Sequence, residues 1–186
     1  PLYGETFMKL IESPALAECV MKAREYYNAG DKDSYSHYKQ MLPAIMWCGV
    51  SETLERKASE LEPTGYFMVD IDHVKEDRNL LSIYNVVRSS NTDFSISRGW
   101  QWEIVASHIT PSGHGIRFVA KCVSKYATLQ ENMDAFVKDF KLDEVGDYDC
   151  ACKDYSRLSF IVPEEDWFCY EGFMFTDNVD TRFLRR

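Results

Sequence analysis

The sequence predicts a mixed α/β (α+β) domain in which a mixed sheet is flanked by helices. Its 186 residues are 45% hydrophobic and 14% aromatic, which is enough apolar material for a packed core. Strand-like apolar runs alternate irregularly with segments of helical periodicity, as is typical of mixed domains. No internal repeat or low-complexity tract is present in the sequence. We therefore expect residues 1–186 to form a single domain.

Two helices and a strand are predicted at the start of the chain. Serine followed by proline opens the segment 13–30 as N-cap and first helical residue, and Asn-Ala-Gly closes it. A second helix is expected over 33–41, before a proline. The stretch AIMWCGV at 44–50 is interpreted as a short buried strand, and the charged stretch 51–65 as a surface connection.

The rest of the chain alternates between apolar strands and amphipathic helices. The expected elements are, in chain order, a strand at 65–74, a helix within 73–90, a turn-rich connection at 89–99, a hairpin of strands 102–110 and 115–123, a helix over 129–140, and a last core strand at 156–162.

Charge and cysteine content exclude several classes of protein. The net charge of -9 argues against nucleic-acid binding by an overall basic field, so any such contact must be local. The six cysteines include no CxxC pair and are interpreted as reduced thiols. No apolar run has the length of a membrane span and no signal peptide is evident, so we expect a soluble cytoplasmic protein without a membrane partner.

Two carboxylates at the end of the strand 65–74 are the strongest candidate site. Side chains alternate along a strand, so Asp70 and Asp72 point to the same side, with backbones about 6.5–7 Å apart. Such a pair can bind Mg2+ or Mn2+ and support phosphoryl transfer. The alternative is that Asp72 caps the following helix, and glycosyltransferases and phosphatases also use this pattern.

The turn TPSGHGIR at 110–117 has phosphate-binding chemistry. Its glycines, Gly113 among them, let the backbone approach a ligand, while Ser112, His114 and Arg117 offer a hydroxyl, an imidazole and a guanidinium. A plain hairpin turn with a surface histidine is the alternative. A zinc site formed by His73, His108 and His114 is less favoured, because their spacing matches no ligand pattern.

The stretch 147–162 offers acids and a base for the same site. Asp149 and Asp154 precede the last predicted strand together with Arg157, in the right order to complete a site built from several strands. A solvated loop, or a structural ion pair between Arg157 and one of these aspartates, would have the same sequence.

Four stretches in this order carry a family resemblance: K39 with LPAIMWCG at 42–49, GYFMVDIDHV at 65–74, TPSGHGIRFVA at 110–120 and KDYSRLSFIV at 153–162. Together they resemble the N-terminal domain of bacterial virulence-associated E (VirE-like) proteins, which is similar to the primase-polymerase (archaeo-eukaryotic primase) superfamily. The resemblance implies a primase-polymerase-like fold and a longer polypeptide with a helicase-like ATPase domain further along. The start at Pro1 and the arginine-rich end are consistent with that expectation.

The resemblance also implies roles for single residues. The first motif, two acids one residue apart, assigns catalytic metal binding to Asp70 and Asp72. The second motif, small-x-His, contacts nucleotide phosphates and is spelled by Ser112-Gly113-His114, whereas the strand register would place Arg117 there instead. A third metal-binding acid is Asp149 or Asp154, of which we assign Asp154, and Arg157 is assigned to phosphate binding.

The leading hypothesis is a bacterial primase-polymerase-like domain of a DNA replication or mobile-element protein. It would bind Mg2+ or Mn2+, a nucleotide triphosphate and single-stranded or primed DNA, and would synthesise primers by nucleotidyl transfer. The first alternative is a catalytically degenerate module that binds DNA or docks the ATPase domain. A phosphotransferase of another class that uses the same paired acids is a third possibility.

Overall fold

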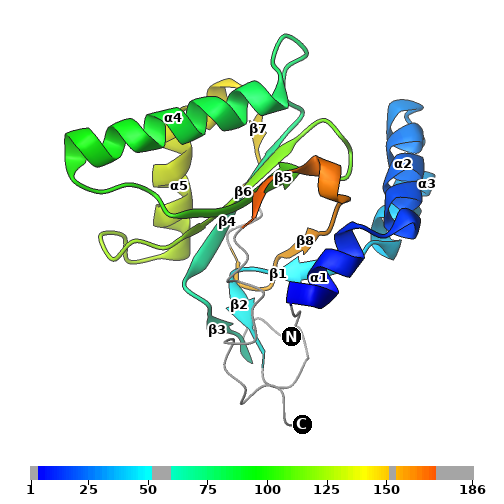
Figure 1. The fold of residues 1–186 in the computed structure, drawn as a ribbon, viewed down its shortest axis with the longest axis horizontal. Coiled ribbons are helices and arrows are strands. Elements are labelled where there is room, and N and C mark those ends of the chain that lie inside the picture. The colour runs from blue at the N-terminus through cyan, green and yellow to red at the C-terminus, as the bar shows by residue number, and fades with distance from the viewer. Residues whose placement is uncertain (1–3, 52–59, 151–153, 171–186) are drawn as a thin grey trace.

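The computed structural model describes residues 4–51, 60–150 and 154–170, and confirms the predicted mixed α+β class. Its centre is a five-stranded sheet of order β7-β4-β6-β5-β9, in which each neighbouring pair is antiparallel. Two small two-stranded sheets, β1-β8 and β2-β3, accompany it. Figure 1 shows α4 and α5 on one side of the central sheet and α1 to α3 on the opposite side.

The bounds of the elements follow the apolar pattern of the sequence. The helices are α1 Gly4–Ile11, α2 Pro14–Asn28, α3 Lys32–Met41, α4 Leu80–Arg98 and α5 Leu129–Phe140, with short 3-10 turns η2 Leu142–Glu144 and η4 Glu164–Asp166. The strands are β1 Ala44–Met46, β2 Gly49–Val50, β3 Glu62–Pro63, β4 Tyr66–Asp72, β5 Ile104–Ile109, β6 Ile116–Lys121, β7 Asp147–Tyr148, β8 Leu158–Phe160 and β9 Trp167–Tyr170.

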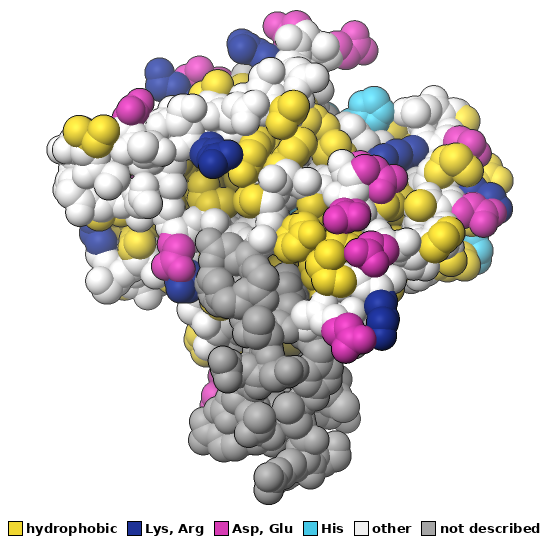
Figure 2. All heavy atoms as spheres, in the orientation of Figure 1, with side chains coloured by type: hydrophobic (Ala, Val, Ile, Leu, Met, Phe, Trp, Pro, Cys, Tyr) yellow, Lys and Arg dark blue, Asp and Glu magenta, His cyan; other side chains and the backbone are white. Residues whose placement is uncertain are grey.

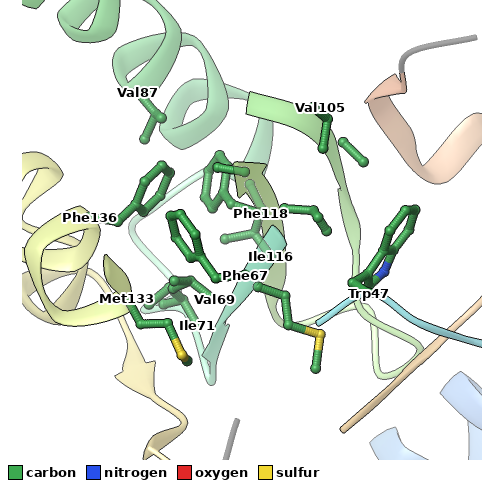
Figure 3. Packing of buried hydrophobic residues seen from close by; sticks show 14 of the residues in the cluster. Trp47, Phe67, Val69, Ile71, Val87, Val105, Ile116, Phe118, Met133 and Phe136 are labelled. Atoms are coloured by element: carbon green, nitrogen blue, oxygen red, sulfur yellow. The ribbon is translucent and has the colours of Figure 1, made fainter. Parts of the chain in front are cut away.

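The main core lies between the central sheet and α5. Phe67 of β4, Phe118 of β6 and Phe136 of α5 are buried and point toward one another (Figure 3). The ring centroid of Phe136 lies 5.6 Å from that of Phe67 and 5.7 Å from that of Phe118. Burying each such ring stabilises the fold by about 1.5–3 kcal/mol, so the alternating residues of β4 and β6 fix which sheet face meets α5.

The opposite face of the sheet therefore receives the other alternate residues. In the register of β4 and β6, Asp70 lies directly opposite Arg117, and Val69 opposite Phe118. Because Val69 and Phe118 face the core, Asp70 and Arg117 face the side on which α2 and α3 lie.

The N-terminal helices are tied to the end of the described chain. Phe7 of α1 is fully buried, with its ring 5.3 Å from Trp167 and 5.6 Å from Tyr170 of β9. Arg24 of α2 forms an ion pair of 2.7 Å with Asp166. These contacts hold the first two helices against the edge strand of the sheet.

One sequence-based prediction is wrong at the level of elements. The stretch 89–99, predicted as turns, is the second half of α4, which ends at Gly99 in a left-handed conformation. The buried Asn91 explains the difference, because its side-chain oxygen accepts from the backbone N–H of Trp102 and its amide donates to the Trp102 carbonyl. A polar residue that was expected in a turn thus anchors a helix to the segment that leads into β5.

The strand predicted at 156–162 is present, but it is shorter than predicted, lies outside the central sheet and is not the last strand. Only β8 forms there, and it pairs with β1 outside the central sheet, while β9 takes the edge next to β5. Pro163 follows within a few residues and cannot donate to a strand ladder, which limits the length of β8. The predicted strand at 44–50 is likewise divided into β1 and β2.

The charges on the surface and the state of the described cysteines are as the sequence predicted. On the face drawn in Figure 2, Lys and Arg side chains are interspersed with Asp and Glu side chains. The five cysteines within the described ranges are free thiols, as predicted, and Cys152 lies outside these ranges. Among the described helices, none is both long and apolar enough to cross a membrane.

Candidate functional site

A pocket of about 400 Å³ opens on the face of the sheet that carries Asp70 and Arg117. Residues from β4, β6, β8, the turn between β5 and β6, and the helices α2 and α3 line it. The lining residues are Tyr27, Tyr35, Lys39, Asp70, Asp72, His73, Thr110, Pro111, Ser112, Arg117, Asp149, Arg157, Leu158 and Phe160. Segments far apart in the sequence thus meet at one concavity on which several polar groups converge, and such convergence makes it the candidate ligand site.

The floor of this pocket is an ion pair between neighbouring strands. Both carboxylate oxygens of Asp70 accept hydrogen bonds from Arg117, one from Nε and one from Nη2. Both side chains are buried, and Arg117 Nη1 also donates to Ser159 Oγ at 2.6 Å. Such a two-pronged, charge-assisted pair compensates the burial of both charges.

His108 extends this network as a neutral imidazole. It is fully buried, and burial together with the neighbouring Arg117 charge lowers its pKa to about 3. Its Nδ1–H donates to the Ile109 carbonyl at 2.8 Å, and its Nε2 lies 3.4 Å from Ser159 Oγ. His108 therefore supports Ser159 behind the pocket and brings no positive charge to it.

Asp72 lies at the rim of the pocket, two residues beyond Asp70. Its pKa is raised above the ordinary aspartate value, first by burial and second by the Asp70 charge, while Arg117 and Lys39 oppose the shift. Asp72 does not cap the following helix: the N-cap of α4 is Asn79, whose side chain accepts from the backbone N–H of Ser82. The strand alternation that predicted a shared side for Asp70 and Asp72 is confirmed, since both line the pocket.

The turn between β5 and β6 divides its polar residues between the pocket and α2. Ser112 lines the pocket, and its hydroxyl lies 3.1 Å from Thr110 Oγ1 and accepts from the backbone N–H of His114 at 3.2 Å. His114 itself is exposed, has its Nε2 2.8 Å from Asn28 Oδ1, and stacks on Tyr27 with ring centroids 5.1 Å apart. Neither His114 nor Gly113 is among the lining residues.

The geometry of this turn requires two glycines: Gly113 has a φ of +81°, and neighbouring atoms crowd Gly115. A Cβ atom at Gly115 would lie 2.7 Å from Thr110 Oγ1, 2.8 Å from the Ile71 carbonyl oxygen and 2.9 Å from Asp72 Oδ1. Backbone-to-backbone approach of this kind leaves no room for a side chain. The turn is thereby held close to the end of β4, where both acids lie.

The third acid of the pocket is Asp149 and not Asp154. Asp149 pairs with Arg157, whose Nη2 lies 2.6 Å from its Oδ2, and both line the pocket. Asp154 is exposed, accepts from the backbone N–H of Ser156 at 2.6 Å and does not line the pocket. The two aspartates were equivalent in sequence, because only the pairing of β7 with β4 brings Asp149 beside Asp70.

The helical hairpin of α2 and α3 supplies three lining residues for which the sequence predicted no role at the site: Tyr27, Tyr35 and Lys39. Lys39 nevertheless belongs to a stretch that carries the family resemblance. The amphipathic pattern of these helices gave no signal for them, since tyrosine and lysine are ordinary residues on a helix surface. Burial, with a further contribution from Asp72, raises the pKa of Tyr35 to about 12, so its hydroxyl stays protonated.

The described residues do not form a ready metal centre. Within the described ranges, no group of three or more His, Cys, Asp or Glu side chains is arranged to hold an ion. Both oxygens of Asp70 are engaged by Arg117, and Asp149 is engaged by Arg157, so Asp72 is the pocket carboxylate without an ion pair in the described structure. A hard divalent ion would require several such oxygens at once.

The fold and the pocket define an α+β domain with a polar, ion-paired pocket on one face of an antiparallel sheet. The chain belongs to the BT4734-like N-terminal domain family, whose sequence model matches residues 37–168. This family is related in general terms to the VirE-like N-terminal domains. Neither a curated protein nor a solved structure matches the chain.

Proposed function

We propose that this chain is a primase-polymerase-like domain whose pocket binds a nucleoside triphosphate beside a DNA template. The observation that carries the proposal is the meeting of three acids and three cations from four separate segments in one pocket. Asp70, Asp72 and Asp149 are the acids. Lys39, Arg117 and Arg157 are the cations, and the Ser112 hydroxyl lines the same pocket.

In this proposal, the pocket cations and the turn between β5 and β6 bind the phosphates of the nucleotide. Arginine forks match phosphate oxygens in two-pronged geometry, and the Ser112 hydroxyl offers a further donor. Mg2+ or Mn2+ would be held at Asp72, with Asp70 or Asp149 added after exchange of an arginine partner, and would supply charge neutralisation for phosphoryl transfer. His114, at the outer side of the turn, would act on phosphate only after leaving Asn28 and Tyr27.

A degenerate module that binds DNA or docks an ATPase domain is the second candidate. The buried pair of Asp70 and Arg117 favours it, because a carboxylate that is saturated by a guanidinium has little affinity left for a cation. In that case the chain would bind single-stranded DNA without metal and would not turn over nucleotide.

Primer synthesis and extension on a single-stranded template, with Mg2+ or Mn2+, separates the two candidates. We expect the parent to extend, Asp72→Asn to lose at least about a hundredfold in rate, and the exposed Asp143→Asn to match the parent. Asp72 is preferred to Asp70 for this test, because removing the Asp70 charge leaves Arg117 buried without its carboxylate. Equal rates for Asp72→Asn and parent would exclude this site, and metal-independent DNA binding without synthesis would establish the second candidate.

A further inference from the structure

The three cations of the pocket differ in how their charges are compensated. Arg117 is paired with Asp70 and Arg157 with Asp149. Lys39, on the last turn of α3, has no carboxylate at ion-pair distance among the residues that the structure describes. Its charge is therefore available to a ligand without the loss of an existing ion pair.

Aromatic rings hold the Lys39 ammonium at the pocket. Its Nζ lies 5.5 Å from the ring centroids of both Tyr35 and Phe160, which line the same pocket. A cation over aromatic faces is oriented by the ring quadrupoles and keeps its full charge. The side chain is half-buried, and this burial lowers its pKa from the ordinary lysine value, against the opposing charges of Asp72 and Asp70.

An ammonium in this environment is incompletely solvated and incompletely paired. Its best partner is a compact, multiply charged oxygen anion that can accept several of its three N–H donors. The Thr110 and Ser112 hydroxyls and Arg117 line the same pocket, so such an anion would also meet other donors there. A carboxylate ligand would offer one charge, whereas a polyphosphate offers several along one chain.

We propose that Lys39 is a phosphate-binding and specificity-determining residue, which contacts the polyphosphate of the incoming nucleotide from the helical hairpin side of the pocket. The inference rests on the proposed function for the identity of the ligand. It adds a binding group from α3 to the strands and turns that supply the other charged residues. The acids and cations that line the pocket are equal in number, so a divalent ion added to the acids would strengthen this contact further.

Equilibrium binding of a labelled nucleoside triphosphate, with and without Mg2+, tests the role of Lys39. We expect Lys39→Met to weaken nucleotide binding at least about tenfold under whichever condition, with or without Mg2+, gives the parent its tighter binding. Lys39→Arg should retain part of the affinity. Lys32→Met, an exposed lysine of the same helix, should bind like the parent. Inorganic triphosphate should displace the labelled nucleotide from the parent and should no longer displace it from Lys39→Met. This result separates a contact with the phosphates from a contact with the base.

The outcomes distinguish this inference from the proposed function. Nucleotide binding that is unchanged in Lys39→Met overturns the role of Lys39, whatever the primer assay shows. Tenfold weaker binding with no primer synthesis by the parent supports Lys39 and removes the polymerase activity. No binding by the parent in either arm overturns both. If Lys39→Met fails to fold, weaker binding by a folded Lys39→Gln supports the role, and unchanged binding by Lys39→Gln overturns it.

Discussion

The ion pair between Asp70 and Arg117 shows how a carboxylate at the end of a core strand is accommodated. The sequence predicted that Asp70 needs solvent, a cation or donors, and the structure supplies a guanidinium from the neighbouring strand. Both charges are buried, so each depends on the other for compensation. Asp72, two residues further along β4, has no such ion-pair partner among the described residues. Its ionisation should therefore affect the stability of the protein differently as the pH changes.

We expect Asp72→Asn to gain stability relative to the parent as the pH rises from about 3.5 to 7. In the folded protein the pKa of Asp72 is raised, while in the unfolded chain it keeps the ordinary aspartate value of 3.8. The folded state therefore binds the proton more tightly, and the stabilisation present below pH 3.8 is lost as the pH rises through the raised pKa. Asparagine does not ionise and is spared this loss.

Urea unfolding of both proteins across this pH range measures the effect. The difference in free energy of unfolding should move in favour of Asp72→Asn with increasing pH, and Asp143→Asn is the matched control for the loss of one exposed charge. A difference that stays constant would show that folding leaves the pKa of Asp72 unchanged, and one that moves in favour of the parent would show that Asp72 is stabilised as a carboxylate, for example by Lys39.

For single residues, the sequence predicted the face of the sheet to which a side chain points better than the residue with which it forms an ion pair. The common face of Asp70 and Asp72 follows from strand alternation alone. The pairing of Asp70 with Arg117 does not, because it depends on β6 lying between β4 and β5, an order that no local pattern fixes. Which of Asp149 and Asp154 lines the pocket was not predictable for the same reason, since both have the same chemistry and only tertiary contacts separate them.

Among the elements, α5 is defined by local sequence and α4 by tertiary contacts. Thr128 and Glu131 form a complete capping box at the start of α5, and apolar residues at helical spacing face the sheet. The apolar face of this helix was predicted from the spacing of these residues. The serine-rich second half of α4 was not predicted as helix, because its buried contacts, such as that of Asn91 with Trp102, join segments that are separate in sequence.

We expect Thr128→Ala to lower the free energy of unfolding by about 1 kcal/mol, which corresponds to a melting temperature about 2–4 °C lower. The substitution removes the acceptor for the Glu131 backbone N–H at the first turn of α5. Thermal unfolding followed by circular dichroism measures the shift.

Ser13→Ala provides the control for this prediction. Ser13 is the N-cap of α2, but its side chain makes no capping hydrogen bond. Its substitution should therefore change the melting temperature by less than that of Thr128. Equal shifts for the two variants would contradict the view that the capping box stabilises α5.

In the molecule as a whole, the fold class was predictable and the topology was not. Composition and periodicity were sufficient for an α+β domain with a single main core. The order of the sheet and the role of β9 as its edge strand depend on contacts between the two ends of the described chain. The pocket shares this dependence, since α2 and α3 close one side of it while β4, β6 and β8 close the others.

We expect Phe7→Ala to lower the free energy of unfolding by about 3–5 kcal/mol, although Phe7 lies outside the span that the family model matches. Its ring is fully buried against Trp167 and Tyr170, and alanine would leave a cavity between α1 and β9. Urea unfolding followed by tryptophan fluorescence measures the loss. The control is Met21→Ala, whose residue is 53% exposed on α2 and should change stability little. A small effect of Phe7→Ala would mean that α1 contributes little to the fold.

The contact between Phe7 and Trp167 has a consequence for the order of events on the ribosome. The first described helix leaves the exit tunnel long before the strand that covers its aromatic ring has been translated. Until then, Phe7 and the edge of β5 have no partner from β9, and such exposed surfaces attract chaperones or other nascent chains. A slow codon tract or an early stop upstream of β9 should therefore yield aggregation instead of a shortened soluble product.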